Sequence, residues 1–220
     1  MRVRHAGLAL LCVLAFAAGA QPVASPATGE WNFRVLLDDA PIGEHRFVLT
    51  AAGDERRLSS EAAFAVKLLG VTVYRYRHSA VEHWRGDCLR RLDADTNDGG
   101  DRSEVRAERE AEGDGPALVV VTPRGRSALP GCVMSFAYWN PAMRAQQQLL
   151  NAQTGKLEPV RIVALDEGRV EVRGRGVAAR RWRVSGPEQP IDLWYAVADG
   201  EWLGLDAQVR GGKKLSYRLK

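Results

Sequence analysis

The sequence predicts a mainly β protein, a single antiparallel β-barrel or half-barrel of roughly a dozen strands with one short helix. Three observations predict this fold. From Trp31 onward, apolar and polar residues alternate with a period of two, as in strands that are buried on one face. Asp-Gly and other glycine-rich turns separate most of the alternating segments, as between antiparallel strands. Residues 140–150 are the one stretch that carries the signals of a helix.

The first strands follow from side-chain alternation. Trp31, Phe33 and Val35 share one face of a strand at residues 31–37, and Asp38-Asp39-Ala40-Pro41 then turns the chain. The alternation resumes in further predicted strands at residues 45–49, 58–67 and 71–84. The last of these has one largely polar face and one aromatic face, and the aromatic face carries Tyr74, Tyr76, His78, Ala80, Glu82 and Trp84.

A tight hairpin and a short buried strand are predicted next. Asn97-Asp98-Gly99-Gly100 lies between alternating residues 89–96 and 102–110, and an Asp-Gly pair suits such a turn. Residues 118–122 are an apolar run of strand length. The remaining strands, again separated by turn residues, are predicted at residues 159–165, 169–173, 177–184, 191–197, 202–209 and 215–219.

The helical segment interrupts this series of strands. Asn140 is an expected N-cap, Pro141 fits the first helical position, and residues 142–150 are good helix formers. Met143, Gln147 and Leu150 fall on one stripe of such a helix. We therefore expect a helix of about three turns here.

The N-terminus predicts export. Arg2 and Arg4 precede an almost wholly apolar stretch, and Ala18-Gly19-Ala20 is a small-x-small site for cleavage before Gln21. The mature protein is therefore expected to be periplasmic. The predicted organisation is a signal peptide, a flexible lead-in rich in Pro, Ala, Ser and Thr, and a single β-barrel-like domain, at residues 1–20, 21–29 and 30–220.

Charge and hydropathy argue against three classes of protein: nucleic-acid binders, helical membrane proteins and outer-membrane barrels. The formal net charge of +4 falls to +2 when Arg2 and Arg4 are removed, which argues against nucleic acid as a partner. Beyond the signal, the longest aliphatic stretch is residues 117–121, far short of the ~20 apolar residues of a membrane helix. The charged face of residues 169–175 does not fit the lipid-facing band of an outer-membrane barrel. We expect a mature chain that does not span a membrane.

The cysteines predict a disulfide. Cys12 leaves with the signal peptide, so Cys88 and Cys132 remain, and two cysteines in an oxidising compartment most simply pair with each other. Their spacing is not the C-x-x-C of a redox or metal pair.

Several short strings occur in a fixed order along the mature chain. They are Asp39-Ala40-Pro41-Ile42-Gly43, Tyr74-Arg75-Tyr76-Arg77-His78 with Trp84, Thr96-Asn97-Asp98-Gly99-Gly100, Ser135-Phe136-Ala137-Tyr138-Trp139-Asn140, Gln153-Thr154-Gly155 and Asp192-Leu193-Trp194-Tyr195. Together they resemble a known family of exported bacterial proteins, the domain of unknown function 6134 group, related to the domain of unknown function 3108 group. The resemblance covers essentially the whole mature chain. It implies an antiparallel β-barrel or half-barrel loosely similar to the periplasmic lipoprotein carriers, and it implies neither an activity nor a catalytic residue.

The metal and surface-charge candidates are weaker than their structural alternatives. Asp93, Asp95, Asn97, Asp101 and Glu104 have the spacing of calcium-loop ligands. The sixth position is not the required glycine and the flanks alternate like strands, so a solvated hairpin is favoured. The histidines are scattered along the chain, and we predict no metal and no cofactor. An arginine-rich stretch could meet anionic lipid headgroups or an acidic partner, but a solvated strand face is favoured; its members are Arg169, Arg173, Arg175, Arg180, Arg181 and Arg183.

The leading functional hypothesis is a periplasmic binding or carrier module for a lipid or another apolar or amphipathic small molecule. The alternative is a structural or assembly factor of the envelope that acts through surface contacts. A hydrolase using Ser135 comes third, because no G-x-S-x-G elbow is present, and a non-enzyme is favoured. A carrier should contain an apolar cavity of several hundred Å³, and an assembly factor a filled interior and an exposed apolar patch. The candidate ligand-binding residues, which are equally interpreted as packed core, are Tyr74, Tyr76, His78, Trp84, Phe136 and Trp139.

Overall fold

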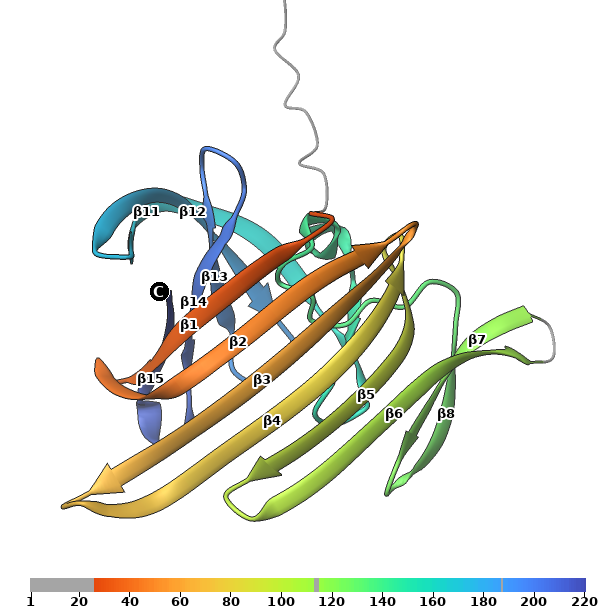
Figure 1. Ribbon diagram of the computed structural model, residues 1–220, viewed down its shortest axis with the longest axis horizontal. Coiled ribbons are helices and arrows are strands. Elements are labelled where there is room, and N and C mark those ends of the chain that lie inside the picture. Colours follow the sequence, from red (N-terminus) through yellow and green to blue (C-terminus); the bar gives the residue numbers. More distant parts are fainter. Residues whose placement is uncertain (1–25, 113–114, 187) are drawn as a thin grey trace, which may run out of the picture.

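The main element of the fold is a single large antiparallel sheet that curves around its inner face (Figure 1). The computed structural model describes residues 26–112, 115–186 and 188–220. The sheet has thirteen strands in the order β11-β12-β13-β14-β15-β1-β2-β3-β4-β5-β6-β7-β8, and its edge strands β11 and β8 leave it open. The predicted mainly β half-barrel is therefore confirmed. The predicted signal peptide and most of the predicted lead-in lie outside the described residues.

Most strands follow the predicted segments, and several extend beyond them. The two strands predicted at residues 159–165 and 169–173 are wrong, because the chain forms one strand there, and the strand at Gly125–Pro130 was not predicted. The sheet strands are β1 (Gly29–Leu37), β2 (Ala40–Ala52), β3 (Glu55–Leu68), β4 (Val71–Arg85), β5 (Cys88–Asp98), β6 (Asp101–Glu112), β7 (Gly115–Thr122), β8 (Gly125–Pro130), β11 (Arg161–Val172), β12 (Arg175–Ser185), β13 (Ile191–Ala196), β14 (Trp202–Gln208) and β15 (Lys214–Leu219). A separate ribbon joins β9 (Gln148–Leu150) to β10 (Leu157–Pro159), and short 3₁₀ helices lie at η1 (Pro141–Ala145) and η2 (Arg210–Gly212). The predicted β5–β6 hairpin is confirmed, with Gly99 and Gly100 at positive φ.

Cross-strand register arranges the inner face of β2 to β5 in rows. One row is small in its centre and consists of Phe47, Ser60, Ala80 and Ala94. The row on one side of it is polar and consists of His45, Ala62, His78 and Thr96. The row on the other side is largely aliphatic and consists of Leu49, Leu58, Glu82 and Leu92. Because facing positions share an environment, these rows decide where the interior is filled and where it is not.

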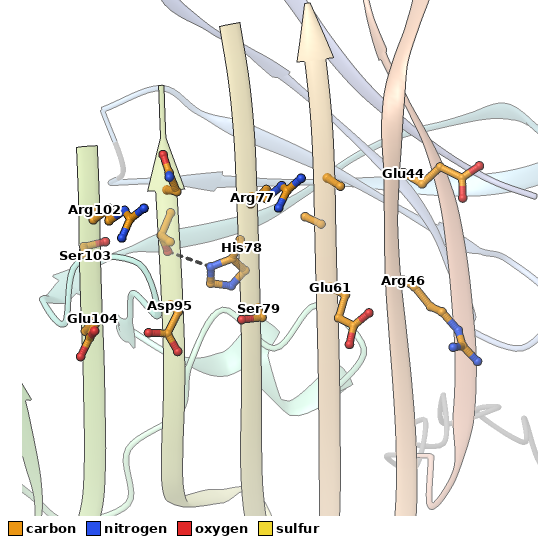
Figure 2. A pocket seen from close by; sticks show the side chains of 14 residues that line it. Glu44, Arg46, Glu61, Arg77, His78, Ser79, Asp95, Arg102, Ser103 and Glu104 are labelled. Atoms are coloured by element: carbon orange, nitrogen blue, oxygen red, sulfur yellow. Dashed lines mark hydrogen bonds between the residues drawn. The ribbon is translucent and has the colours of Figure 1, made fainter. Parts of the chain in front are cut away.

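The outer face of the same strands is charged. It carries an open depression of about 650 Å³, crossed by side chains from β2 to β6 (Figure 2). Both signs of charge are present, in Glu44, Arg46, Glu61, Arg77, Asp95, Arg102 and Glu104. A polar outer face and an apolar inner face are what the period-two alternation predicts.

Residues 131–160, which we call the plug, leave the sheet after β8 and pack against its inner face before β11 begins (Figure 1). The plug contributes buried side chains to the same core as the strands, namely Val133, Met134, Ala137, Trp139, Met143, Leu149 and Leu150. The plug connects β8 and β11, the two edge strands of the sheet, and does not itself form a strand of that sheet. The plug therefore fills much of the interior that a closed barrel would enclose.

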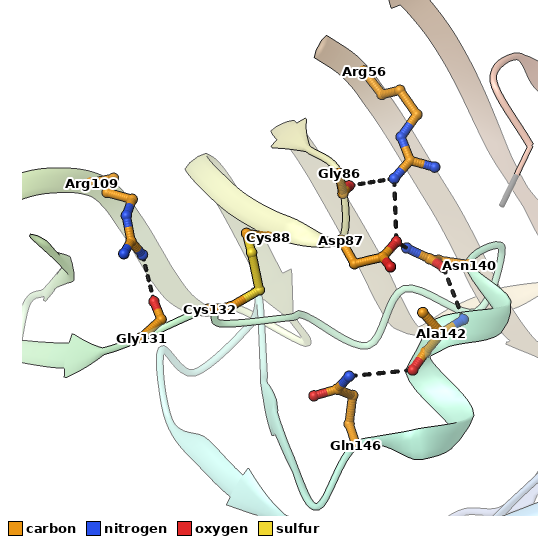
Figure 3. The surroundings of a disulfide bond; sticks show 10 residues. All are labelled: Arg56, Gly86, Asp87, Cys88, Arg109, Gly131, Cys132, Asn140, Ala142 and Gln146. Atoms are coloured by element: carbon orange, nitrogen blue, oxygen red, sulfur yellow. Dashed lines mark hydrogen bonds and ion pairs between the residues drawn. A yellow bond between two sulfur atoms is a disulfide. The ribbon is translucent and has the colours of Figure 1, made fainter. Parts of the chain in front are cut away.

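A disulfide ties the start of the plug to the sheet (Figure 3). Cys88 at the start of β5 and Cys132 are bonded, with their Cα atoms 5.0 Å apart. The backbone N–H of Leu89 donates to the carbonyl of Val133 at 2.8 Å, so the plug runs on directly from the bond along β5. The predicted disulfide is confirmed.

The predicted helix of about three turns is wrong beyond its first turn. Asn140 does cap it, accepting a 3.0 Å hydrogen bond from the Ala142 N–H, and Pro141 is its first residue. The helix is a 3₁₀ turn that ends at Ala145, and residues 148–150 form a strand instead. A short helix is marginal on its own, and the chain here gains β9–β10 pairing and complete burial of Leu149 and Leu150. Tertiary burial therefore outweighs local helix propensity.

Within the described residues, the structure contains no helix that is both long and apolar enough to cross a membrane.

Candidate functional site

The candidate site is a cavity of about 200 Å³ between the inner face of β2 to β4 and the plug. Strands β13 and β14 contribute Ile191 and Trp202 to its wall. Its apolar lining includes Phe47, Leu58, Ala80, Phe136, Tyr138 and Trp139. Its hydrogen-bonding lining includes His45, Ser60, His78, Glu82, Ser135 and Asn151.

Small side chains explain why the space is left open. Ser60 and Ala80 lie opposite each other on β3 and β4 and both line the cavity. Phe47 continues their row on β2 and stands against Trp202, with 5.1 Å between ring centroids. The plug spans the row without filling the volume above the two small residues, so the cavity is a consequence of register.

Glu82 is a buried acid that connects the sheet to the plug. Its carboxylate accepts hydrogen bonds from Ser135 Oγ at 2.9 Å and from Trp84 Nε1 at 3.0 Å. Burial raises the pKa of Glu82 to about 7 from its ordinary 4.5, although both hydrogen bonds favour the ionised form. The carboxyl group therefore keeps its proton to a much higher pH than an exposed glutamate does.

Two histidines lie side by side on the inner face. The rings of His45 and His78 have centroids 6.4 Å apart. His45 Nδ1 lies 3.3 Å from the Tyr217 hydroxyl and Nε2 lies 3.4 Å from Ser60 Oγ, while His78 Nδ1 lies 2.9 Å from Thr96 Oγ1. Burial lowers the pKa of His45 to about 3 and of His78 to about 4. Both rings are neutral at pH 7, so each presents one donor and one acceptor.

The fold is expected to lose stability in acid between pH 6.5 and pH 4.5, the ordinary pKa values of histidine and glutamate. An unfolded chain protonates both histidines below pH 6.5, whereas the folded protein keeps them neutral down to about pH 4 and about pH 3. Glu82 acts in the opposite direction, because the folded protein binds its proton below about pH 7 and the unfolded chain only below pH 4.5. The difference of about one proton corresponds to about 1.4 kcal/mol of unfolding free energy per pH unit.

Denaturant unfolding at several pH values in this window tests the slope. The Glu82→Gln variant lacks the opposing contribution, so its unfolding free energy should fall about twice as steeply with acid. Equal slopes for the variant and the wild type would contradict the assignment of Glu82.

The structure places three of the six predicted ligand-binding residues around the cavity, namely His78, Phe136 and Trp139. The other three lie elsewhere on the inner face. Trp84 is fully buried in the core, edge-on to Trp139 with 5.6 Å between ring centroids. Tyr76 stacks on Phe64, and Tyr74 is exposed and donates a hydrogen bond to Asp98.

Several cavity residues were not among the predicted ones. His45 and His78 are distant in sequence, and only the pairing of β2 with β3 and β3 with β4 brings them together. The sequence places Glu82 on the aromatic face of a strand and Ser135 in another segment, and their hydrogen bond depends on the path of the plug. Inward alternation identifies His45, Ser60 and Glu82 as facing the interior, and it does not say which of them meet.

The remaining sequence candidates are accounted for by local structure. The acidic segment lies on β5 and β6, where Arg106 bonds Asp95 and Arg91 bonds Asp93. In the described part of the chain, no group of three or more His, Cys, Asp or Glu residues is arranged to hold a metal ion. In the arginine-rich stretch, Arg180 pairs with Glu167, and Arg183 pairs with Asp192.

Comparison with known proteins shows a family and a fold. A comparison with curated protein sequences found no match. A similar solved structure is the crystal structure of a β-barrel-like protein of domain of unknown function DUF1849 from Brucella abortus, with 12% identity and a TM-score of 0.62. The match covers 90% of this chain and 97% of that chain, and at this identity it shows the fold alone. The predicted relationship to the domain of unknown function 3108 group stays a prediction. Residues 33–220 match the family described as a domain of unknown function (DUF6134), and the chain belongs to that family.

Proposed function

We propose that the protein is a periplasmic binding module that holds an uncharged amphipathic or apolar small molecule in the cavity between β2 to β4 and the plug. The observation that carries the proposal is the composition of this cavity, in which aromatic and aliphatic walls meet a cluster of buried hydrogen-bonding groups. Ligand sites typically combine an apolar lining with a few convergent polar groups.

The volume sets the size of the ligand. A dry cavity of ~150 Å³ is enough to bind benzene, whereas drug-sized ligands occupy ~300–1,000 Å³. At about 200 Å³, the cavity is smaller than the several hundred Å³ expected of a carrier, and it fits one ring or a short alkyl chain with a polar end. A larger ligand would place only part of itself there.

The charges inside the cavity favour a neutral ligand. The described residues that line it include no lysine or arginine, and the acid that does line it is Glu82. A ligand carboxylate buried in this cavity would have no cationic partner, which is strongly unfavourable. The indole N–H of Trp139 is buried and has no acceptor among the described residues, so a ligand oxygen or a water that reached it would be favourable.

Octanol is therefore expected to bind more tightly than octanoate, a matched pair that differs in the charge of the polar end. Chemical-shift titration at pH 7 measures both affinities, and we expect at least a tenfold preference for the alcohol, or about 1.4 kcal/mol. The Ala80→Leu variant fills the space above Ser60 and should lose octanol binding. Ala63→Leu is the matched control, because Ala63 is exposed on the outer face of β3.

Two results would contradict the proposal. One is an Ala80→Leu variant that is folded and binds octanol like the wild type. The other is tighter binding of octanoate, since the cavity would then stabilise a negative charge that its residues do not explain.

A second candidate function rests on the exposed tip of the β3–β4 hairpin, where Leu68, Leu69, Val71 and Val73 are solvent-accessible. An envelope structural or assembly factor that acts through surface contacts would use such a patch. If the Ala80→Leu variant loses octanol binding but still performs the protein's role in the cell, this candidate is favoured.

A further inference from the structure

The β3–β4 hairpin projects beyond both of its neighbours. Pairing of β2 with β3 begins at Phe64, and pairing of β4 with β5 begins at Tyr76. Residues 65–75 therefore form a two-stranded arm with no strand beside it on either side. Leu68 lies four residues past Phe64, or ~14 Å at the rise of a β-strand. Figure 1 shows this arm extending past the adjacent turns at the lower left of the view.

The end of the arm is apolar although it is open to solvent. Leu68, Leu69, Val71 and Val73 are exposed to 64%, 96%, 66% and 58%. Leu69 also has a φ of 49°, in the left-handed region where asparagine and glycine are the usual residues. Neither packing nor turn geometry explains a leucine at this position, so a contact outside the fold is indicated.

Basic side chains stand behind the apolar tip. Lys67 and Arg75 on the arm, Arg77 just beyond it on β4 and Arg102 on β6 are exposed, and in the described part of the chain none of them has an ion-pair partner. Asp98, which accepts a hydrogen bond from Tyr74, and Asp101 at the β5–β6 turn are nearby acids. Arg77 and Arg102 also share the outer depression with Glu44, Glu61, Asp95 and Glu104, so Lys67 and Arg75 are the basic residues nearest the tip and farthest from these acids. Apolar residues at the end and basic residues behind them match the layers of an anionic bilayer surface, the acyl region and the headgroups.

We propose that the β3–β4 arm inserts its tip into the surface of an anionic phospholipid bilayer and so holds the protein at a membrane. Interfacial segments enter the headgroup and acyl boundary by ~5–10 Å, which the length of the arm allows. Membrane binding by the arm does not depend on the cavity, so the Ala80→Leu variant should bind membranes like the wild type.

Vesicle co-sedimentation tests the proposal at physiological salt. The wild type is expected to bind vesicles of equal parts phosphatidylglycerol and phosphatidylcholine, and to bind pure phosphatidylcholine vesicles far less. Leu68→Ser/Leu69→Asn should weaken binding at least about tenfold, because two large aliphatic side chains no longer leave water. Arg75→Gln/Arg77→Gln should weaken binding about fivefold for each charge and reduce its dependence on salt.

The controls separate binding from folding. Asparagine suits the φ of residue 69, so the melting temperature of the Leu68→Ser/Leu69→Asn variant should equal or exceed that of the wild type. Val121→Thr removes an exposed apolar side chain from the outer face of β7 and should bind vesicles normally. The proposal is overturned if the wild type does not bind the anionic vesicles, or if the Leu68→Ser/Leu69→Asn variant binds them like the wild type. It is also overturned if the protein dimerises through this arm in the absence of vesicles.

Discussion

The double variant Cys88→Ala/Cys132→Ala is expected to lose about 4 kcal/mol of unfolding free energy. The bond joins residues 44 apart in the sequence, and closing a loop of that length removes many conformations from the unfolded chain. It also fixes the residue at which the plug begins, beside the start of β5. Urea denaturation of the oxidised wild type and of the variant measures the difference.

Reduction of the wild type is the matched control for this variant. Reduced wild type and the alanine variant should unfold at the same urea concentration, since both lack the bond. A loss below about 1 kcal/mol in both would show that contacts of the plug, and not the covalent link, hold it against the sheet.

The second large effect is expected from Trp84→Ala, with a loss of about 3–5 kcal/mol. Trp84 is fully buried, packs edge-on against Trp139 of the plug and donates its indole N–H to Glu82. Alanine leaves a cavity in the core and removes one of the two hydrogen bonds to a buried acid. Chemical denaturation monitored by far-ultraviolet circular dichroism tests this without relying on tryptophan emission.

Two companion variants interpret the effect of Trp84→Ala: one separates the ring from its N–H, and the other is a control for burial. Trp84→Phe keeps much of the buried ring but not the N–H, so it should recover most of the lost stability. Tyr74→Ala removes an exposed aromatic from the same face of β4 and should cost less than about 1 kcal/mol. Equal losses for Tyr74→Ala and Trp84→Ala would contradict the burial that distinguishes the two residues.

Much of the sheet could be predicted from the sequence because a strand with one buried face repeats every two residues. That rule correctly assigns His78, Glu82 and Trp84 to one face of β4. The disulfide could be predicted from the expected compartment and from the count of cysteines left after the signal peptide. Neither inference needs knowledge of which strands are neighbours.

The plug and the cavity could not be predicted in this way. Residues 146–150 resemble a helix locally, and only the partners of Leu149 and Leu150 in three dimensions make the chain extended there. The cavity exists because Ser60 meets Ala80 across two strands, which is a property of register and not of either segment alone. The meeting of His45 with His78 has the same origin.

Native mass spectrometry of protein purified from the cell envelope, followed by organic extraction, tests most directly whether the cavity holds a ligand. We predict that the wild type retains a small uncharged molecule that is released on extraction, and that Ala80→Leu, purified in parallel, carries none. A wild-type protein whose mass is that of the bare polypeptide, and whose melting temperature octanol does not change, would contradict the proposal.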